Sequence, residues 1–456
     1  MVSTQQNGVA PANSESAAGI TAFTATAIAV ADMVGIGVFT SLGFQLFSIQ
    51  SGFALVMLWV VGGIVALCGA LCYGELAASL PRSGGEYNFL SRAYHPAIGF
   101  MAGWLSATVG FAAPIALACM AFGAYFNGVF PGIAPPMALG LGIAWIITLI
   151  HLSGMRHTSM FQNVSTVFKV ILIVGFIIAG FAMGEPQPLS FAPSAIDWQH
   201  MTGAPFAVSL VYVMYAYSGW NASVYIVDEI RDPQRTVPRA LFAATLIVLT
   251  LYVALNALFL YTTPIESMVG QLDVAQVVGT HIFGAQGGRI VGGLICIGLV
   301  SAISAMVWLG PRVTKVMGED LPLLRLFSIE TKSGVPAAAI LLQAAIVTLM
   351  ISTDSFESVL NFIQFSLTLS SFLAVLGVMV LRWRQPALAR PYRTWGYPVT
   401  PLIFLGVTLF MMIYLVQERP LESFAGFALL CAGLVVYAAS FKFKQPLRVS
   451  GETANE

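Results

Sequence analysis

The most informative stretch of this sequence is ADMVGIGVFTSLGF, residues 31–44. It lies inside a long apolar run, yet it contains the acidic residue Asp32 and the glycines Gly35 and Gly37. A segment that only had to cross a lipid bilayer would avoid both features, because a charge is costly in hydrocarbon and glycine weakens a helix. The stretch therefore predicts a membrane helix that is interrupted about halfway along its length.

The composition places the whole chain in a membrane. Its 456 residues are 58% hydrophobic and only 9% charged, with a mean hydropathy of +0.85. That much apolar surface exceeds what a soluble core can bury. Crossing about 30 Å of hydrocarbon takes roughly 20 apolar residues per helix. We therefore expect an all-α polytopic membrane protein.

Twelve apolar runs are long enough to act as transmembrane helices. They lie at approximately 20–46, 52–80, 97–127, 135–153, 160–183, 204–229, 239–262, 288–317, 335–352, 357–383, 400–416 and 422–441. The longest links, near 184–203, 263–287, 318–334 and 384–399, leave no room for a soluble domain. We expect a single transmembrane domain over 20–441.

The chain ends and the basic residues predict the orientation. The links after even-numbered runs, together with the C-terminal tail, contain nearly all Lys and Arg residues, whereas the opposite side keeps only Arg289 and Arg419. The basic side is expected to be cytoplasmic. Residues 1–19 then form a disordered cytoplasmic tail without a signal-peptide pattern, and 442–456 form a second cytoplasmic tail.

A second interruption occupies the matching place in the sixth run. Ser218 and Gly219 follow about fifteen residues after its start, as residues 35–37 do in the first run. Interrupted helices five spans apart predict two inverted repeats, about 20–183 and 204–383, with extra helices at about 400–441 and a substrate site between the repeats. The alternative is that these glycines serve close helix packing.

A broken helix in lipid frees backbone groups that must find partners. The N–H groups of residues 35–37 lie at the positive end of the following half-helix and suit a carboxylate. The carbonyl groups of Met33, Tyr215 and Ser218 suit an ammonium group. An α-amino acid presents both charges, so the two breaks predict an amino acid site.

The run YAYSGWNASVYIVDEIRDPQRTVPRAL, residues 215–241, resembles the L-amino-acid-transporter branch of the amino acid-polyamine-organocation (APC) superfamily. That branch shows an aromatic-rich FxYxGW break followed by Glu-Glu-Ile, Asn-Pro, Arg and Pro. Similar stretches are YGELAASLPRSGGEYNFL at 73–90, GPRVTKVMGEDLPL at 310–323 and RPYRTWGYPVTPL at 390–402. The resemblance covers nearly the whole chain.

The resemblance implies a LeuT-type fold of two inverted five-helix repeats, with helices 1 and 6 broken and two helices added, that carries an amino acid by alternating access. It implies that Ile36 and Gly37 bind the substrate carboxylate. It implies an aromatic gate at Tyr215, next to the break that continues into Gly219 and Trp220. Where the branch commonly has Gly-Ser-Gly, this chain has isoleucine in the middle, so a hydroxyl is missing.

Lys169 is the only base deep within a run, where its charge must be compensated. It resembles the lysine that takes the place of sodium in sodium-independent relatives, although a purely structural brace held by carbonyl groups is the alternative. Asp32 lies one turn before the first break. It could partner Lys169, take part in proton coupling, or attract a cationic substrate.

Charged residues gather where the second, sixth and eighth runs reach the basic side. They are candidates for a cytoplasmic gate of breakable ion pairs, with solvated loop ends as the alternative: Glu75, Arg82, Glu86, Glu229, Arg231, Arg235, Arg312 and Lys315. Ser301 and Ser304 on the eighth run are weaker candidates for contact with the substrate side chain, because membrane hydroxyls usually bond their own backbone.

We thus expect a sodium-independent carrier of L-amino acids, an exchanger or a proton symporter, in the cytoplasmic membrane. The alternatives are a cationic amino acid or polyamine carrier that uses Asp32 and an amino acid sensor without transport. The sequence shows no catalytic constellation, metal site, cofactor motif or nucleic-acid-binding feature. The loop FNGVFPGIAPP after the third run lacks cysteine, so no disulfide-linked partner is expected.

Overall fold

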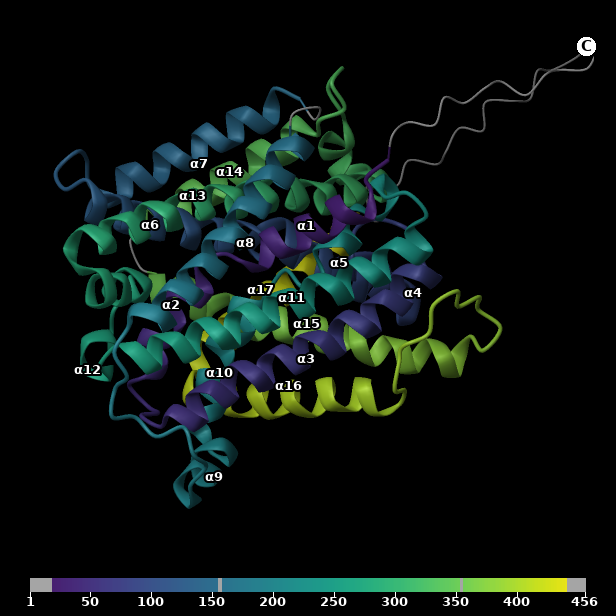
Figure 1. Cartoon of the computed structure of the whole chain (residues 1–456). Helices are drawn as coiled ribbons and strands as arrows, with labels where there is room; N and C mark the ends of the chain where they lie inside the picture. The colour runs from purple at the N-terminus through teal and green to yellow at the C-terminus, as the bar shows by residue number, and fades with distance from the viewer. Residues whose placement is uncertain (1–18, 155–157, 353–355, 441–456) are drawn as a thin grey trace, which may run out of the picture.

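A computed structural model describes residues 19–154, 158–352 and 356–440. In this part of the chain the regular elements are helices, and the backbone pairing outside them is an isolated bridge between Ile20 and Ile230. The long helices lie side by side in one bundle, as Figure 1 shows. The expectation of an all-α fold is confirmed.

The helices of the first half extend to the end of the fifth predicted run. They are α1 (Ala22–Met33), α2 (Gly37–Gln45), α3 (Gly52–Ser79), α4 (Glu86–Ala93), α5 (Pro96–Leu105), the π-helical turn η1 (Ser106–Gly110), α6 (Ala112–Val129), α7 (Pro136–Leu152) and α8 (Thr158–Met183).

The second half adds the remaining helices. They are α9 (Ala195–Thr202), α10 (Ala204–Tyr217), the 3-10 helix η2 (Ala222–Glu229), α11 (Pro233–Thr262), α12 (Ile265–Met268), α13 (Val274–Asp320), the 3-10 helix η3 (Pro322–Ser328), α14 (Ala337–Ile351), α15 (Phe356–Arg384), α16 (Val399–Glu418) and α17 (Pro420–Ser440).

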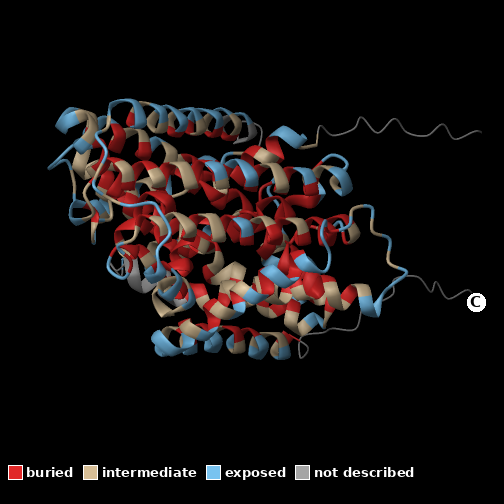
Figure 2. Ribbon diagram, turned by 60° about the horizontal axis from the view of Figure 1, so that its bottom comes forward, coloured by how far each residue is buried: buried red, intermediate tan, exposed pale blue. Residues whose placement is uncertain are grey.

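Nine helical segments of the described chain are long and apolar enough to cross a membrane, and α7 and α14 are shorter apolar helices. The protein is therefore a polytopic helical membrane protein. Large apolar side chains on the outside of the bundle agree with this, since α8 exposes Ile171, Ile178 and Phe181 by 44–65% of their surface. Buried residues concentrate inside the bundle, as Figure 2 shows.

Three predicted links contain helices. The region near 184–203 includes α9, and the region near 318–334 includes η3. The region near 263–287 includes α12 and the first turns of α13, which bends at Gly284 where φ is +74°. The first turns of α13 lie outside the predicted apolar run, and Val274, Ala275 and Val278 bury one side of these turns against the bundle.

Both predicted helix breaks are present. α1 ends at Met33 and α2 begins at Gly37, with the backbone of Val34 outside helical geometry (φ −76°, ψ 69°). α10 ends at Tyr217, and Ser218 is extended (φ −54°, ψ 143°). Because the helical hydrogen-bond pattern stops at both places, backbone groups are left for other partners.

Candidate functional site

The two breaks face each other and approach very closely. A β-carbon built on Gly37 would lie 2.5 Å from the Cα atom of Ala216, and one built on Gly219 would lie 2.6 Å from Oδ2 of Asp32. Gly219 also has φ of +98°, a conformation that residues with a β-carbon rarely adopt. Close packing thus explains Gly37, and both the break and the packing explain Gly219.

Gly35 is different. The nearest atom to a β-carbon built there is 3.9 Å away, on Ala302, which is ordinary contact. Packing therefore does not require this glycine. Gly35 lines the small cavity at the break.

A small cavity lies directly between the breaks. Its lining contains Asp32 and the six residues that the sequence predicts for binding the two ends of an amino acid: Met33, Gly35, Ile36, Gly37, Tyr215 and Ser218. These residues come from segments about 180 positions apart in the chain. The fold therefore brings the predicted binding groups to one place.

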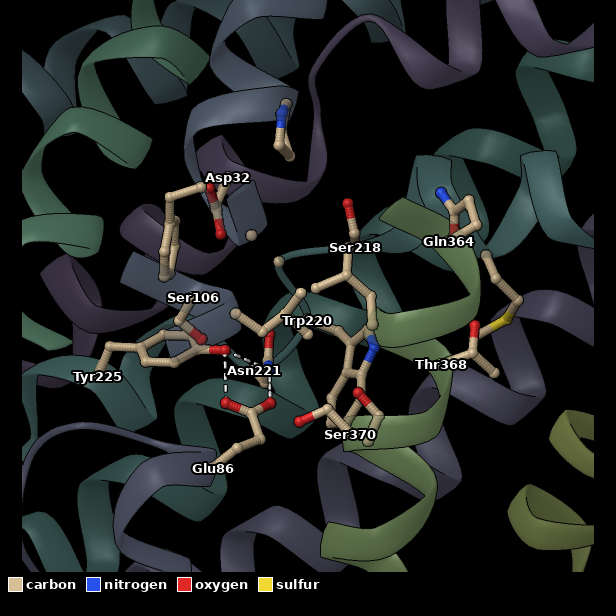
Figure 3. Close-up of a pocket in the computed structure, with 18 of the residues that line it drawn as sticks. Asp32, Glu86, Ser106, Ser218, Trp220, Asn221, Tyr225, Gln364, Thr368 and Ser370 are labelled. Carbon is tan, nitrogen blue, oxygen red and sulfur yellow. Dashed lines mark hydrogen bonds between the residues drawn. The ribbon is translucent and has the colours of Figure 1, made fainter. Parts of the chain in front are cut away.

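A larger cavity adjoins the first one. The two share Asp32, Pro114, Ser218 and Met306, and the larger one extends past Trp220. Figure 3 shows its polar side chains. They come from α4, η1, the second break, η2 and α15, and include Glu86, Ser106, Asn221, Tyr225, Gln364, Thr368 and Ser370.

The start of α2 presents free backbone donors. Among the hydrogen bonds of the described residues, none uses the N–H groups of Ile36 or Gly37. Both residues line the small cavity, at the end of the helix where the dipole is positive. This geometry can accept an anionic group such as a carboxylate.

The carbonyl groups at the breaks are not equivalent. Met33 O accepts from the Gly35 N–H (2.7 Å) and lies 2.5 Å from the Tyr252 hydroxyl, and Tyr215 O accepts from the Ser218 N–H (3.0 Å). Ser218 O has no donor among the described residues. Of the three carbonyl groups predicted to bind an ammonium group, Ser218 O is therefore the one left without a protein partner.

Lys169 reaches the first break from α8. Its Nζ atom donates to Val34 O at 2.7 Å and to Ala31 O at 3.3 Å, and the residue is only 3% exposed. These carbonyl groups belong to the last turn of α1 and the first residue after it, where the helix dipole favours a cation. Lys169 thus stabilises the interrupted backbone.

Asp32 makes no direct ion pair with Lys169, although the two charges attract each other through the protein interior. No ion pair within 4.0 Å joins the two described side chains, and the Asp32 carboxylate accepts no hydrogen bond from any other described residue. One of its oxygen atoms lies against Gly219, and the residue lines both cavities. The carboxylate is therefore available to a ligand.

Glu86 lies inside the larger cavity, bound to neutral donors. Its carboxylate accepts from Tyr73 Oη (2.8 Å), Asn221 Nδ2 (2.7 Å) and Tyr225 Oη (2.7 Å), and the residue is 4% exposed. The dashed lines of Figure 3 mark the bonds from Asn221 and Tyr225. The cluster ties α4 to the segment that follows the second break.

Ser301 and Ser304 bond to neighbouring helices. Ser304 Oγ lies 2.9 Å from Nε2 of His151 on α7, and Ser301 Oγ is 3.3 Å from Gln162 Nε2 and 3.1 Å from Ser165 Oγ on α8. Neither serine lines the two cavities at the breaks. Their bonds hold α13 against α7 and α8.

The charged residues at the predicted gate form separate pairs. Arg312 binds Glu229 at 3.0 Å, and Arg82 binds Asp320 at 2.7 Å, so α13 is linked both to η2 and to the turn before α4. The hydrogen bond to Asp320 raises the pKa of Arg82.

Other predicted gate residues behave differently. Arg235 is 3.9 Å from Asp232 with both side chains mostly exposed, and Arg231 is exposed. Glu75 binds Arg382 at 2.6 Å and Arg390 at 3.4 Å, so it holds the link before α16 rather than η2 or α13. The structure thus distributes these residues over several places.

Sequence reasoning missed several residues of the larger cavity. Asn221 and Tyr225 follow Gly219 of the second predicted break by two and six positions. Their closeness to the break in the sequence could have indicated that they line the cavity. Ser106 and Gly110 belong to the π-helical turn η1 within the third run, and Gln364 belongs to α15. No sequence pattern marks which of their faces turns inward.

The fold and the two cavities define a class: a multi-pass helical membrane protein with a polar cavity between two interrupted helices. Residues 20–437 match the family described as amino acid permease. The chain belongs to this family, as the resemblance implied.

Known relatives agree with this assignment. Mouse b(0,+)-type amino acid transporter 1 is 28% identical over 436 residues, covering 93% of this chain and 88% of the relative. Rabbit large neutral amino acids transporter small subunit 2 is 26% identical, covering 91% and 78%. Mouse Asc-type amino acid transporter 1 is 25% identical, covering 91% and 79%. These relatives are transporters and not enzymes.

Proposed function

We propose that this protein is a sodium-independent secondary transporter of L-amino acids that works by alternating access in the cytoplasmic membrane. Exchange and proton symport are the two coupling modes to be separated. One observation carries the proposal: donors at Ile36 and Gly37 and an acceptor at Ser218, all without a partner among the described residues, line one small cavity. A zwitterion would satisfy both sets at once.

The substrate pose follows from these groups. The carboxylate accepts from the N–H groups of Ile36 and Gly37, at the start of α2. The ammonium group donates to Ser218 O and to the Asp32 carboxylate. The substrate side chain then extends past Trp220 into the larger cavity, which shares Asp32 and Ser218 with the smaller one.

We extend the proposal to the complete topology. Each of the twelve predicted runs coincides with one to three helical elements of the described chain, and the two breaks lie in the first and sixth runs. This supports two five-helix repeats with α16 and α17 added, and both chain ends on the cytoplasmic side. The gate on that side would then include the Arg312–Glu229 and Arg82–Asp320 pairs.

Lys169 supports sodium independence. Its ammonium group occupies the carbonyl groups of Ala31 and Val34, which are ligands of the kind that a hard cation requires. A fixed ammonium group at this position makes a bound sodium ion unnecessary for holding the break. Proton symport would additionally require Lys169 or Asp32 to change its protonation state during the cycle.

The test is uptake into proteoliposomes that contain the purified protein. A panel of radiolabelled L-amino acids is offered to empty and to preloaded vesicles, with sodium or choline outside and with two opposite pH gradients. Saturable uptake that persists in choline supports the proposal. Faster uptake into preloaded vesicles indicates exchange, and dependence on an inward proton gradient indicates symport. Strict sodium dependence would contradict the Lys169 argument.

A second candidate is a carrier of cationic amino acids or polyamines. The carboxylate of Asp32 favours it, because this acid lines both cavities beside the binding groups and makes no ion pair within 4.0 Å among the described residues, so that it can attract a positive ligand. Competition separates the two candidates. Inhibition of uptake by arginine or putrescine, without inhibition by leucine or alanine, would favour the cationic carrier.

A further inference from the structure

We propose that a groove between α11 and the link before α16 binds the head group of an anionic phospholipid. The groove is lined by Gln234, Arg235, Arg239 and Phe242 of α11, by Tyr392 and Trp395 of the link, and by Leu71 of α3 with Pro238 and Pro391. It is separate from the two cavities at the helix breaks. The proposal does not depend on the transport proposal.

The groove carries positive charge that the protein does not neutralise. Arg235 and Arg239 are both exposed, and no acidic residue belongs to the lining. Arg235 is 3.9 Å from Asp232, with the side chains 76% and 60% exposed, a pair that contributes little in water. Arg239 has no acidic partner within 4.0 Å in the described chain. Two guanidinium groups are therefore available to a phosphate.

The remaining lining is apolar and aromatic. The ring of Trp395 packs edge-on against Phe242 at 5.5 Å between centroids and lies 6.3 Å from that of Tyr392. Trp395 is still exposed. Tryptophan and tyrosine favour the level of the lipid head groups. A soluble anion would need only the arginines, whereas a phospholipid also covers the apolar wall, so the lining favours a lipid.

Glu75 of α3 fixes the link that forms one wall of the groove. Glu75 of α3, 3% exposed, accepts from Arg382 through both carboxylate oxygens (2.9 and 2.6 Å) and from the backbone N–H of Thr394 (2.7 Å). It also pairs with Arg390 at 3.4 Å. Residues 390–394 are thereby fixed against α3, which places Tyr392 and Trp395 opposite α11 before any ligand arrives.

The position of the groove at one end of the helix bundle suits a lipid rather than a soluble partner. The link between α15 and α16 projects at one end of the helix bundle, as Figure 1 shows, where the ends of membrane helices meet the head-group region. Basic pockets between membrane helices at this level bind anionic head groups. The proposed ligand class is phosphatidylglycerol and its relatives with a net negative head group.

The test is a titration of the full-length protein in a neutral detergent with dioleoyl phosphatidylglycerol or dioleoyl phosphatidylcholine, read by the thermal unfolding midpoint and by lipid adducts in native mass spectrometry. We expect phosphatidylglycerol, but not phosphatidylcholine, to raise the midpoint and to form a saturable adduct. Each arginine near a membrane surface is worth about 1 kcal/mol. Arg239→Gln should therefore weaken binding about 5-fold, and the double variant Arg235→Gln with Arg239→Gln about 30-fold.

Matched controls separate this site from general charge attraction. Arg325→Gln and Arg289→Gln remove exposed arginines outside the groove and should leave the titration unchanged. Trp395→Ala keeps both charges and should weaken lipid binding through the apolar wall. Unfolding midpoints without lipid show that each variant is folded.

Three results would overturn the proposal. One is equal stabilisation by both lipids, and another is a double arginine variant that binds phosphatidylglycerol like the unaltered protein. The third is an equal response to glycerol phosphate or inorganic phosphate with Trp395→Ala unaffected, which would identify a site for a soluble anion.

Discussion

Gly219 lies so close to Asp32 that a β-carbon at position 219 would stand 2.6 Å from the Asp32 carboxylate oxygen Oδ2. This approach joins the two interrupted helices, because Asp32 belongs to the last turn of α1 and Gly219 follows the end of α10. Any shift of one half-helix relative to the other changes the surroundings of the carboxylate. The residues that line the cavity are thus the same residues that hold the two half-helices together.

Gly219→Ala should abolish most transport. Alanine would have to adopt φ near +98° and would overlap the carboxylate, so the strain should cost about 1–3 kcal/mol and displace Asp32. We expect uptake below a tenth of the normal rate and a lower unfolding midpoint. The matched control is Gly175→Ala in α8, where nothing lies within 4 Å of a β-carbon and uptake should be unchanged. Normal uptake by the Gly219 variant would contradict the proposed site.

Asp32→Asn should weaken binding of the substrate ammonium group. Hydrogen bonds to charged groups are worth about 1.5–3 kcal/mol, so inhibition constants should rise by at least about 10-fold. A rise for every amino acid places Asp32 at the α-ammonium group, and a rise for arginine and putrescine alone supports the cationic carrier. Glu266→Gln, an exposed acid on α12, serves as the control. If no inhibition constant changes, Asp32 has neither role.

Lys169→Met should leave the first break without its cation. Val34 O and Ala31 O would lose their donor inside the protein, at a cost of about 1–3 kcal/mol for an unsatisfied buried group. We expect uptake in choline to fall more than about 10-fold, measured beside Lys332→Met, which removes an exposed lysine. Restored uptake upon addition of sodium would show that the ion takes over the vacated place. Unaltered uptake in choline would refute the role of Lys169.

Glu86→Gln should loosen the segment after the second break. The carboxylate accepts three hydrogen bonds, from Tyr73, Asn221 and Tyr225, and the amide can accept at only one of its two positions. We expect a loss of stability of about 1–3 kcal/mol and a changed maximum uptake rate. Glu418→Gln, an exposed acid at the end of α16, is the control. An unfolding midpoint equal to that of the control would contradict the cluster's role.

Arg312 and Glu229 should show strong energetic coupling. The pair is short, 3.0 Å, and Arg312 is largely buried, so a double-mutant cycle with Arg312→Gln and Glu229→Gln should give an interaction energy of about 0.5–3 kcal/mol. The comparison cycle is Arg235→Gln with Asp232→Asn, where exposure and a distance of 3.9 Å predict a value near zero. Equal coupling in both cycles would remove the basis for a specific gate.

Much of the fold was predictable because its causes are local. Hydropathy identifies helices over the apolar runs, and Gly35 and Gly219 mark where helical backbone stops. The two breaks also predicted a site between them, which is where the small cavity lies. The helices in the links were missed, since the first turns of α13 are held by packing against the bundle rather than by a long apolar run.

The partners of individual side chains were not predictable. Glu86 belongs to the cavity rather than to an ion pair at the gate, Ser301 and Ser304 bond to α8 and α7, and Asp32 does not pair with Lys169. Each outcome depends on the rotation of one helix about its own axis relative to its neighbours. A rotation of a few tens of degrees exchanges a cavity-lining residue for one that bonds a neighbouring helix.

By itself, the amino-acid sequence determined that this protein is a bundle of membrane helices with two interruptions, because solvation of apolar side chains and helical propensity act within a single segment. Only the tertiary structure decided which freed backbone groups remain unpaired. The Met33 and Tyr215 carbonyl groups have hydrogen-bond donors within the protein, while Ser218 O and the N–H groups of Ile36 and Gly37 have no partner in the described part of the chain. The physical reason is that a hydrogen bond requires its donor and acceptor within about 3 Å, and that distance is set by how distant segments pack.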